Sequence, residues 1–256
     1  MFDLDVTAGV ARITLCRPPV NAISADWLKR FHEMLDELGR RDDWSVLHLR
    51  SSQNVFCAGA DLGEMRERFE RGRGSPGLGD DFARSTRAIH DLFDRIEALP
   101  QVTLAEIGGA AMGGGFELAL SCDLRIAADK AKLGLPETRL GLIPGAGGTQ
   151  RLSRLVGPGI AARVILGCEI IEGETAREMG LVQWSAPAPK LAAQAAGIAG
   201  HIAGLPAHAV AAAKSCLAAA RDPVRDGYAE EINATKNLVT TKQTQALVSA
   251  FLERKR

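Results

Sequence analysis

The chain has 256 residues and a formal net charge of +0, from 31 basic and 31 acidic residues. Its length suits one large domain, or a domain with a smaller appendage, and 46% hydrophobic residues are ordinary for a globular protein. The balanced charge argues against nucleic acid as a partner, because nucleic-acid binders usually carry a basic excess. Five cysteines without a C-x-x-C pair argue against a disulfide framework or a structural zinc site.

The sequence shows no targeting or membrane-spanning pattern. Residues 1–5 have no basic region and no long apolar run, so we predict no secretory signal and no transit peptide. No stretch reaches the apolar length needed to cross a bilayer. The five histidines lack metal-ligand spacing. We therefore expect a cytoplasmic protein with no membrane partner, no metal and no cofactor.

The first half of the chain predicts strands and amphipathic helices in alternation. Alternating apolar and polar residues predict a strand over 9–15, and an apolar run predicts another over 46–50. Ser24 is an expected N-cap for the helix between them, and Gly39 its expected end. That helix has apolar residues at helical spacing, namely Leu28, Phe31, Leu35 and Leu38.

The next segment, residues 66–80, is rich in Arg, Glu and Gly. It is either a flexible, lid-like segment or a solvated helix end followed by a loop. Helical periodicity follows over 82–99 and ends at Pro100, and an apolar run predicts a strand over 102–107.

The second half begins with a predicted buried helix over 116–122 and a strand over 123–128. A glycine-rich connection, residues 140–149, leads into a further helix. From about residue 174 the pattern is almost wholly helical. Strand–helix units followed by helices predict an α/β fold. We divide it into a core over 1–190 and a helical region over 191–256.

Two glycine-containing loops each follow an apolar strand and precede a helix. They cover residues 55–62 (Val-Phe-Cys-Ala-Gly-Ala-Asp-Leu) and 108–117 (Gly-Gly-Ala-Ala-Met-Gly-Gly-Gly-Phe-Glu). Glycine lets a ligand approach the main chain closely, and N–H groups at helix starts can bind an anion-like oxygen. The candidate donors are the backbone N–H groups of Ala60 and Gly114. Cys57 is expected to be a packed apolar residue, since no His lies near it in sequence.

Two carboxylates follow the second loop. Glu117 lies in an otherwise apolar helix, where burial would raise its pKa toward neutrality, as a general acid or base requires. Glu137 follows Pro136, a pair that is also common at helix starts for purely structural reasons. The loops and Glu117 together favour a catalytic role for Glu137. The pattern indicates carbonyl polarisation beside acid–base chemistry.

Several motifs, in order, resemble enoyl-CoA hydratases of the crotonase superfamily. The matching segments are residues 17–23, 56–65, 113–123, 135–152 and 250–256. The resemblance implies a crotonase-like spiral of ββα units with a C-terminal α-helical trimerisation region, in a homotrimer or a dimer of trimers. It implies an acyl-CoA thioester as substrate, with CoA as part of that substrate rather than a cofactor.

The resemblance also implies roles for individual residues. Ala60 and Gly114 match the two main-chain donors of the oxyanion hole, and Glu117 and Glu137 match the two catalytic glutamates of the hydratases. Residues matching the substrate and CoA contacts are Ala22, Ala58, Ala60, Asp61, Leu62, Gly63, Gly114, Phe251 and Arg254. The last two match positions that often act from a neighbouring subunit. Segment 66–80 is longer than in many relatives.

Both glutamates are kept, so the resemblance favours reversible hydration of a 2-enoyl-CoA to a 3-hydroxyacyl-CoA. An enoyl-CoA isomerase, or another acyl-CoA enzyme of the superfamily, is the alternative. A non-catalytic homologue that binds RNA or protein is a more distant one, against which the neutral charge argues.

Overall fold

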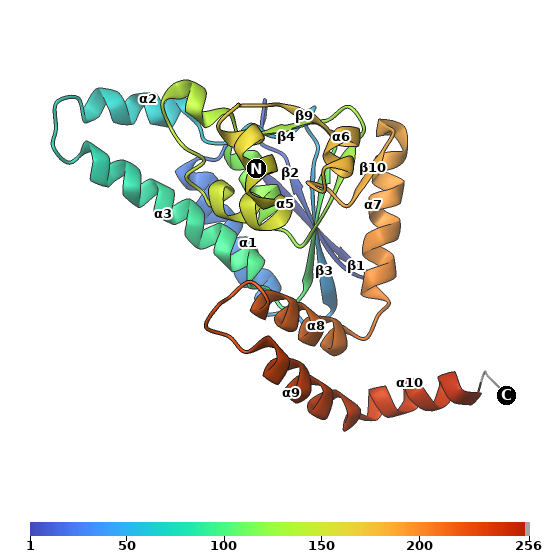
Figure 1. The fold of residues 1–256 in the computed structure, drawn as a ribbon. Coiled ribbons are helices and arrows are strands. Elements are labelled where there is room, and N and C mark those ends of the chain that lie inside the picture. The colour runs from blue at the N-terminus through green and yellow to red at the C-terminus, as the bar shows by residue number, and fades with distance from the viewer. Residues whose placement is uncertain (254–256) are drawn as a thin grey trace.

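The computed structural model describes residues 1–253, in which two sheets are combined with helices on both sides (Figure 1). Within that range the larger sheet has six strands, in which only β1 and β2 pair antiparallel. In spatial order its strands are β1 (Phe2–Thr7), β2 (Gly9–Leu15), β3 (Trp44–Ser51), β5 (Val102–Ile107), β7 (Leu124–Ala128) and β10 (Trp184–Ala186). The predicted α/β class is confirmed.

The smaller sheet carries the loops that matter for the site. In the described chain it has four short strands, β4 (Val55–Cys57), β6 (Ala110–Met112), β8 (Lys132–Gly134) and β9 (Ile171–Glu172). Strands β4, β6 and β8 run parallel, so the segments that follow them leave at the same edge. The first glycine loop follows β4. The second contains β6, where we had predicted only loop.

Helices complete the structure of residues 1–253. They are α1 (Ala25–Gly39), α2 (Leu62–Arg71), α3 (Leu78–Glu97), α4 (Gly114–Leu120), the 3-10 helix η1 (Pro136–Leu140), α5 (Gly148–Ile165), α6 (Gly173–Glu178), α7 (Ala188–Ala203), α8 (Ala207–Ala219), α9 (Gly227–Val239) and α10 (Lys242–Glu253). Helix α7 packs on one face of the larger sheet, and α1 and α3 lie on the other side (Figure 1).

The helix α1 shows how local sequence and core packing agree. The Ser24 hydroxyl accepts a hydrogen bond from the Trp27 N–H at 3.1 Å, which confirms the predicted N-cap. The apolar side chains spaced along this helix are buried, among them Trp27 and Phe31. The rings of these two residues pack with Phe2 of β1, with centroids 5.1–5.2 Å apart. The core thus joins α1 to the edge of the larger sheet.

Some predicted elements need correction. Strands β1 and β10 were not predicted, and β10 interrupts the C-terminal part that we expected to be helical. For segment 66–80 the structure agrees with the second predicted alternative, a helix end followed by a loop, because α2 ends at Arg71 and α3 begins at Leu78. The division of the chain at residue 190 stays a prediction; helix α7 crosses that position, and its buried residues pack on the larger sheet. Among residues 1–253 no single helix is long and apolar enough to cross a membrane, although α7 and α8, bent by 102°, pass that test as a pair.

Candidate active site

The two glycine loops touch one another. Gly59 has φ +93°, and a Cβ added there would lie 2.8 Å from the Met112 carbonyl oxygen and 3.1 Å from the Gly114 nitrogen. Both its backbone angle and the space around it therefore require glycine. A Cβ added at Gly114 would lie 3.6 Å from the Ala60 nitrogen. The two predicted donors are therefore close neighbours, although 54 positions separate them in the chain.

The Ala60 and Gly114 N–H groups occupy different places relative to the helices. Gly114 is the first residue of α4, which begins two residues before the helix predicted over 116–122. Ala60 lies one residue before Asp61, the N-cap of α2, so it precedes that helix rather than beginning it. Within residues 1–253 neither N–H donates to a protein acceptor. Both are available to a ligand oxygen.

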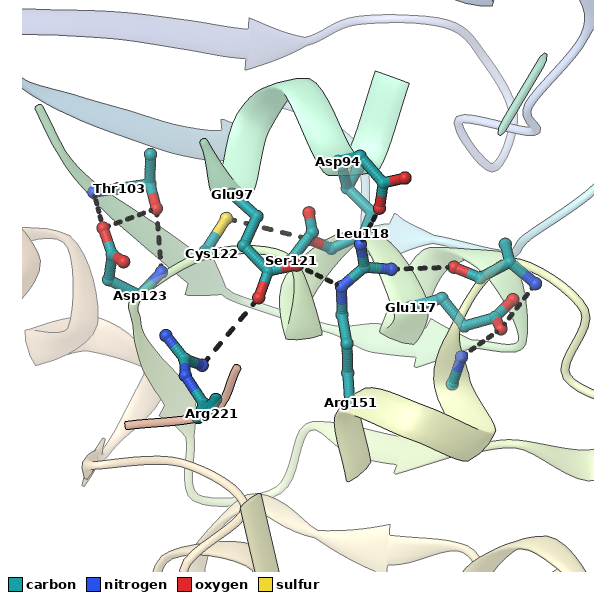
Figure 2. A network of polar contacts seen from close by, with 12 residues as sticks. Asp94, Glu97, Thr103, Glu117, Leu118, Ser121, Cys122, Asp123, Arg151 and Arg221 are labelled. Atoms are coloured by element: carbon teal, nitrogen blue, oxygen red, sulfur yellow. Dashed lines mark hydrogen bonds and ion pairs between the residues drawn. The ribbon is translucent and has the colours of Figure 1, made fainter. Parts of the chain in front are cut away.

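Glu117 is held in place by two backbone donors. Its side chain is buried, with 2% of the residue exposed. One carboxylate oxygen, Oε1, accepts hydrogen bonds from the Ala146 N–H at 2.8 Å and the Gly148 N–H at 2.7 Å (Figure 2). Burial raises the pKa of Glu117 to about 7, and the nearby Glu137 adds to this rise, while the two N–H donors oppose it. Both of these hydrogen bonds go to Oε1, so the second oxygen, Oε2, can accept from a ligand.

The Glu137 carboxylate lies against Gly113 of the second loop. It lies in η1 directly after Pro136, so the predicted helix start is confirmed as a 3-10 turn. Gly113 has φ +51°, and a Cβ there would lie 2.8 Å from Glu137 Oε1. The other oxygen, Oε2, is buried and has no hydrogen-bond partner in the described structure. Burial raises the pKa of Glu137. A buried carboxylate oxygen without a partner suits contact with substrate or water.

A cavity of about 710 Å³ brings these groups together. Six of the predicted residues line it: Ala58, Ala60, Leu62, Gly114, Glu117 and Glu137. Its remaining walls are mostly apolar side chains from α2, α3 and the segment after η1, including Met65, Phe82, Ile89 and Leu142. A second cavity of about 500 Å³ lies between α1, α2 and α3. It shares five lining residues with the first, namely Ala60, Met65, Phe82, Thr86 and Ile89.

The remaining predicted contact residues do not line the larger cavity. The Ala22 carbonyl accepts a hydrogen bond from Arg17 at 2.5 Å, and Asp61 caps α2 while pairing with Arg17 at 2.6 Å. Asp61 does line the second cavity, and Gly63 lines neither. Phe251 lies on α10 and lines neither cavity. Arg254 lies outside the described residues.

Cys57 is the packed residue that the sequence led us to expect. It is fully buried, and burial raises the pKa of its thiol to about 12. A thiol with such a pKa is not a nucleophile near neutral pH.

Sequence reasoning missed the groups that hold Glu117. The glycine-rich residues 140–149 predict only a loop that leads into a helix. One sequence feature could have indicated these donors. A run of small residues immediately precedes α5, and small side chains leave the backbone N–H groups at a helix start accessible to a carboxylate. The apolar residues of α2 and α3 that line the cavity were also missed, because helical spacing does not reveal which cavity a face borders.

The arrangement combines two free N–H donors with two carboxylates on one apolar cavity, which suits an enzyme that stabilises negative charge on an acyl oxygen and moves protons beside it. The sequence matches the enoyl-CoA hydratase/isomerase family over residues 5–256. The chain belongs to this family.

Individual relatives match this chain over nearly its whole length. The chain is 33% identical over 257 residues to the short-chain-enoyl-CoA hydratase of Clostridium acetobutylicum, covering 99% of this chain and 95% of that one. It resembles the crystal structure of an enoyl-CoA hydratase from Bacillus anthracis with a TM-score of 0.90 and 35% identity, over 99% and 96% of the two chains. It resembles DspI of Pseudomonas aeruginosa with a TM-score of 0.88 and 33% identity, over 99% and 94%. The fold is that of the crotonases.

Proposed function

We propose that this chain is an enoyl-CoA hydratase, which adds water reversibly across the double bond of a 2-enoyl-CoA. The observation that carries the proposal is the presence of two carboxylates, Glu117 and Glu137, on a cavity that also exposes the Ala60 and Gly114 N–H groups. Hydration adds a hydroxyl group to one carbon and a proton to the next. Two acid–base groups beside one water can supply both steps, because one takes a proton from the water and the other gives a proton to carbon.

The N–H groups of Ala60 and Gly114 act on the thioester oxygen. Water is a weak nucleophile toward an alkene, so the double bond must first become electron-poor. Two hydrogen bonds to the thioester oxygen stabilise the enolate-like charge that develops during attack. Removing one preorganised donor of this kind typically costs about 3–4 kcal/mol in the transition state.

The glutamates divide the proton transfers. Glu117 orients the water and takes its proton during attack at C3, and Glu137 delivers a proton to C2. A Glu117 pKa of about 7 keeps a useful fraction of the base ionised at neutral pH while leaving it basic enough to act. The two carboxylates influence one another, so their proton-transfer roles belong to the pair.

The test is to mix the purified chain with crotonyl-CoA and follow loss of the conjugated thioester absorbance, with identification of the 3-hydroxy product. A 3-enoyl-CoA offered to the same enzyme reports isomerisation. Conversion of the 3-enoyl substrate to the 2-enoyl product without hydration would assign the isomerase activity instead. Tight RNA binding without activity on either substrate would contradict both.

The helical C-terminal region supports a proposed homotrimer, or a dimer of trimers. Helices α9 and α10 have no buried residue in the single chain, and they extend away from the sheets (Figure 1). Apolar side chains such as Tyr228 and Ile232 are exposed there, at 83% and 70%. The family resemblance implies that, in such an assembly, Phe251 and Arg254 contact the CoA of a neighbouring subunit. Sedimentation of the full chain measures the assembly.

A further inference from the structure

The turn that holds Glu117 is itself held by helix α3. The His90 ring nitrogen Nε2 lies 2.5 Å from the Gly145 carbonyl oxygen. A carbonyl can only accept, so this nitrogen carries the proton and donates. The Gly145 carbonyl and the Ala146 N–H belong to the same peptide unit, and that N–H donates to Glu117 at 2.8 Å. A chain of two hydrogen bonds therefore runs from His90 through one peptide unit to the carboxylate.

A second connection reaches the next peptide unit. The Arg151 guanidinium donates from Nη1 to the Ala146 carbonyl at 3.0 Å (Figure 2). It pairs with two carboxylates of α3, Asp94 at 2.5 Å and Glu97 at 2.9 Å. The Arg151 side chain is 8% exposed, although both acidic partners are more open. Arg151 thus joins α3 to the turn between the two N–H donors of Glu117.

The spacing along α3 aligns these contacts. His90, Asp94 and Glu97 are separated by four and three positions, so they lie on one face of the helix. A Cβ added at Gly145 would lie 3.4 Å from Thr86 of the same helix, which shows how closely α3 and the turn pack. His90 and Arg151 do not line the reaction cavity. They therefore act through the turn and not on the substrate.

We propose that His90 and Arg151 are positioning residues, which orient residues 145–148 and thereby set the direction and basicity of the Glu117 carboxylate. Donation to a peptide carbonyl polarises that peptide and strengthens its own N–H as a donor. A stronger donor stabilises the ionised carboxylate. The inference rests on the proposed function for its kinetic consequence, whereas its effect on Glu117 is independent of the reaction.

The expected result is a shift in the titration of Glu117. His90→Phe removes the donor, so the N–H groups stabilise the Glu117 carboxylate less and its pKa rises by about half a unit. His90→Gln keeps an N–H donor and should restore most of the difference. The matched control is Arg95→Met, because Arg95 is on the same helix but binds the His32 carbonyl and Asp36 of α1 instead. It should leave the titration of Glu117 unchanged.

The measurement is a pH titration of the side-chain carboxyl carbons of the full chain, labelled with carbon-13 on glutamate, in which the Glu117 signal is identified by its absence in Glu117→Gln. A His90→Phe midpoint equal to that of Arg95→Met would overturn the proposal. If His90→Phe does not fold, Arg151→Met provides the test. It removes the donor to Ala146 together with a nearby positive charge, so it should shift the midpoint in the same direction, and no shift would again overturn the proposal.

Kinetics provide a second readout. At pH 7 a shift of half a unit lowers the ionised fraction of a group with a pKa near 7 about twofold, so kcat for hydration should fall about twofold with KM unchanged. A loss confined to KM would contradict a positioning role. Absence of hydration by the wild-type chain would sink the proposed function, while the carboxyl titration would still decide the role of His90.

Discussion

The two walls of the reaction cavity are held by different interactions. One wall, formed by α4, η1 and residues 145–148, carries Glu117 and Glu137 and is fixed by backbone hydrogen bonds and the ion pairs of Arg151. The other wall is α2 with the first turns of α3. Helix α2 has no buried residue. Under the proposed function, the first wall carries the chemistry and the second shapes the space for the acyl group.

The largest expected effects fall on the first wall. Glu117→Gln and Glu137→Gln should each lower kcat for hydration at least ~100-fold, the scale of a positioned general acid or base. The assay is loss of enoyl-thioester absorbance at saturating substrate. Either variant working at nearly the wild-type rate would remove that residue from the catalytic group and weaken the distinction between the walls.

A smaller loss is expected when the carboxylate is displaced and not removed. In Gly148→Ala the new Cβ would lie 2.8 Å from Glu117 Oε1 and 2.9 Å from the Pro144 Cβ, so the carboxylate must move. A displacement of about 1 Å can cost on the order of 100-fold in rate, so we expect a loss of roughly 10- to 100-fold in kcat. Gly159→Ala is the control, because nothing lies within 4 Å of a Cβ there. Equal rates for the two variants would argue against tight positioning.

Burial of Glu117 should also appear in the pH dependence of stability. Its pKa is raised to about 7 in the folded chain, so the folded state holds the proton more tightly than the unfolded state. Below the pKa that Glu117 has in the unfolded chain, its neutral carboxyl contributes fully to the free energy of unfolding. This contribution is lost as pH rises through about 7, the pKa of Glu117 in the folded chain. Glu117→Gln avoids this loss. Near pH 8 we expect the free energy of unfolding of Glu117→Gln to exceed that of the wild type by about 3 kcal/mol. Below about pH 4 we expect the two proteins to have similar free energies of unfolding.

Urea denaturation of the two proteins at both pH values measures that difference. A difference independent of pH would show that Glu117 is not the titrating group.

The second wall should give the smallest effect. The rings of Phe69 in α2 and Phe82 in α3 pack with centroids 4.8 Å apart, and Phe69 is 46% exposed. Phe69→Ala should lower the free energy of unfolding by only about 1 kcal/mol and leave kcat for crotonyl-CoA within about twofold. KM for longer enoyl groups should change more, since Phe69 lines the cavity. A large loss of kcat for the short substrate would erase the contrast between the walls.

The site was partly predictable from local sequence. Glycines at 59 and 114 indicated close approach to the main chain, and an acidic residue inside an apolar helix indicated a buried carboxylate at 117. The partners of that carboxylate were not predictable, because Ala146 and Gly148 lie about 30 positions away and donate through the backbone. Backbone donors have no side-chain signature, and nothing in the spacing of His90 or Arg151 shows that they contact the turn.

The sequence by itself determined the α/β class, the capped helix α1 and the strand β5. It also indicated that both glycine loops let a ligand approach the main chain. These follow from periodicity, turn chemistry and helix caps, all of which act within a few residues. Only the tertiary structure decided that the two loops touch, that Glu137 faces Gly113 and that α3 holds the turn beside Glu117. These contacts join segments far apart in the chain. The first two also depend on the parallel pairing of strands β4, β6 and β8, which brings the segments after them together.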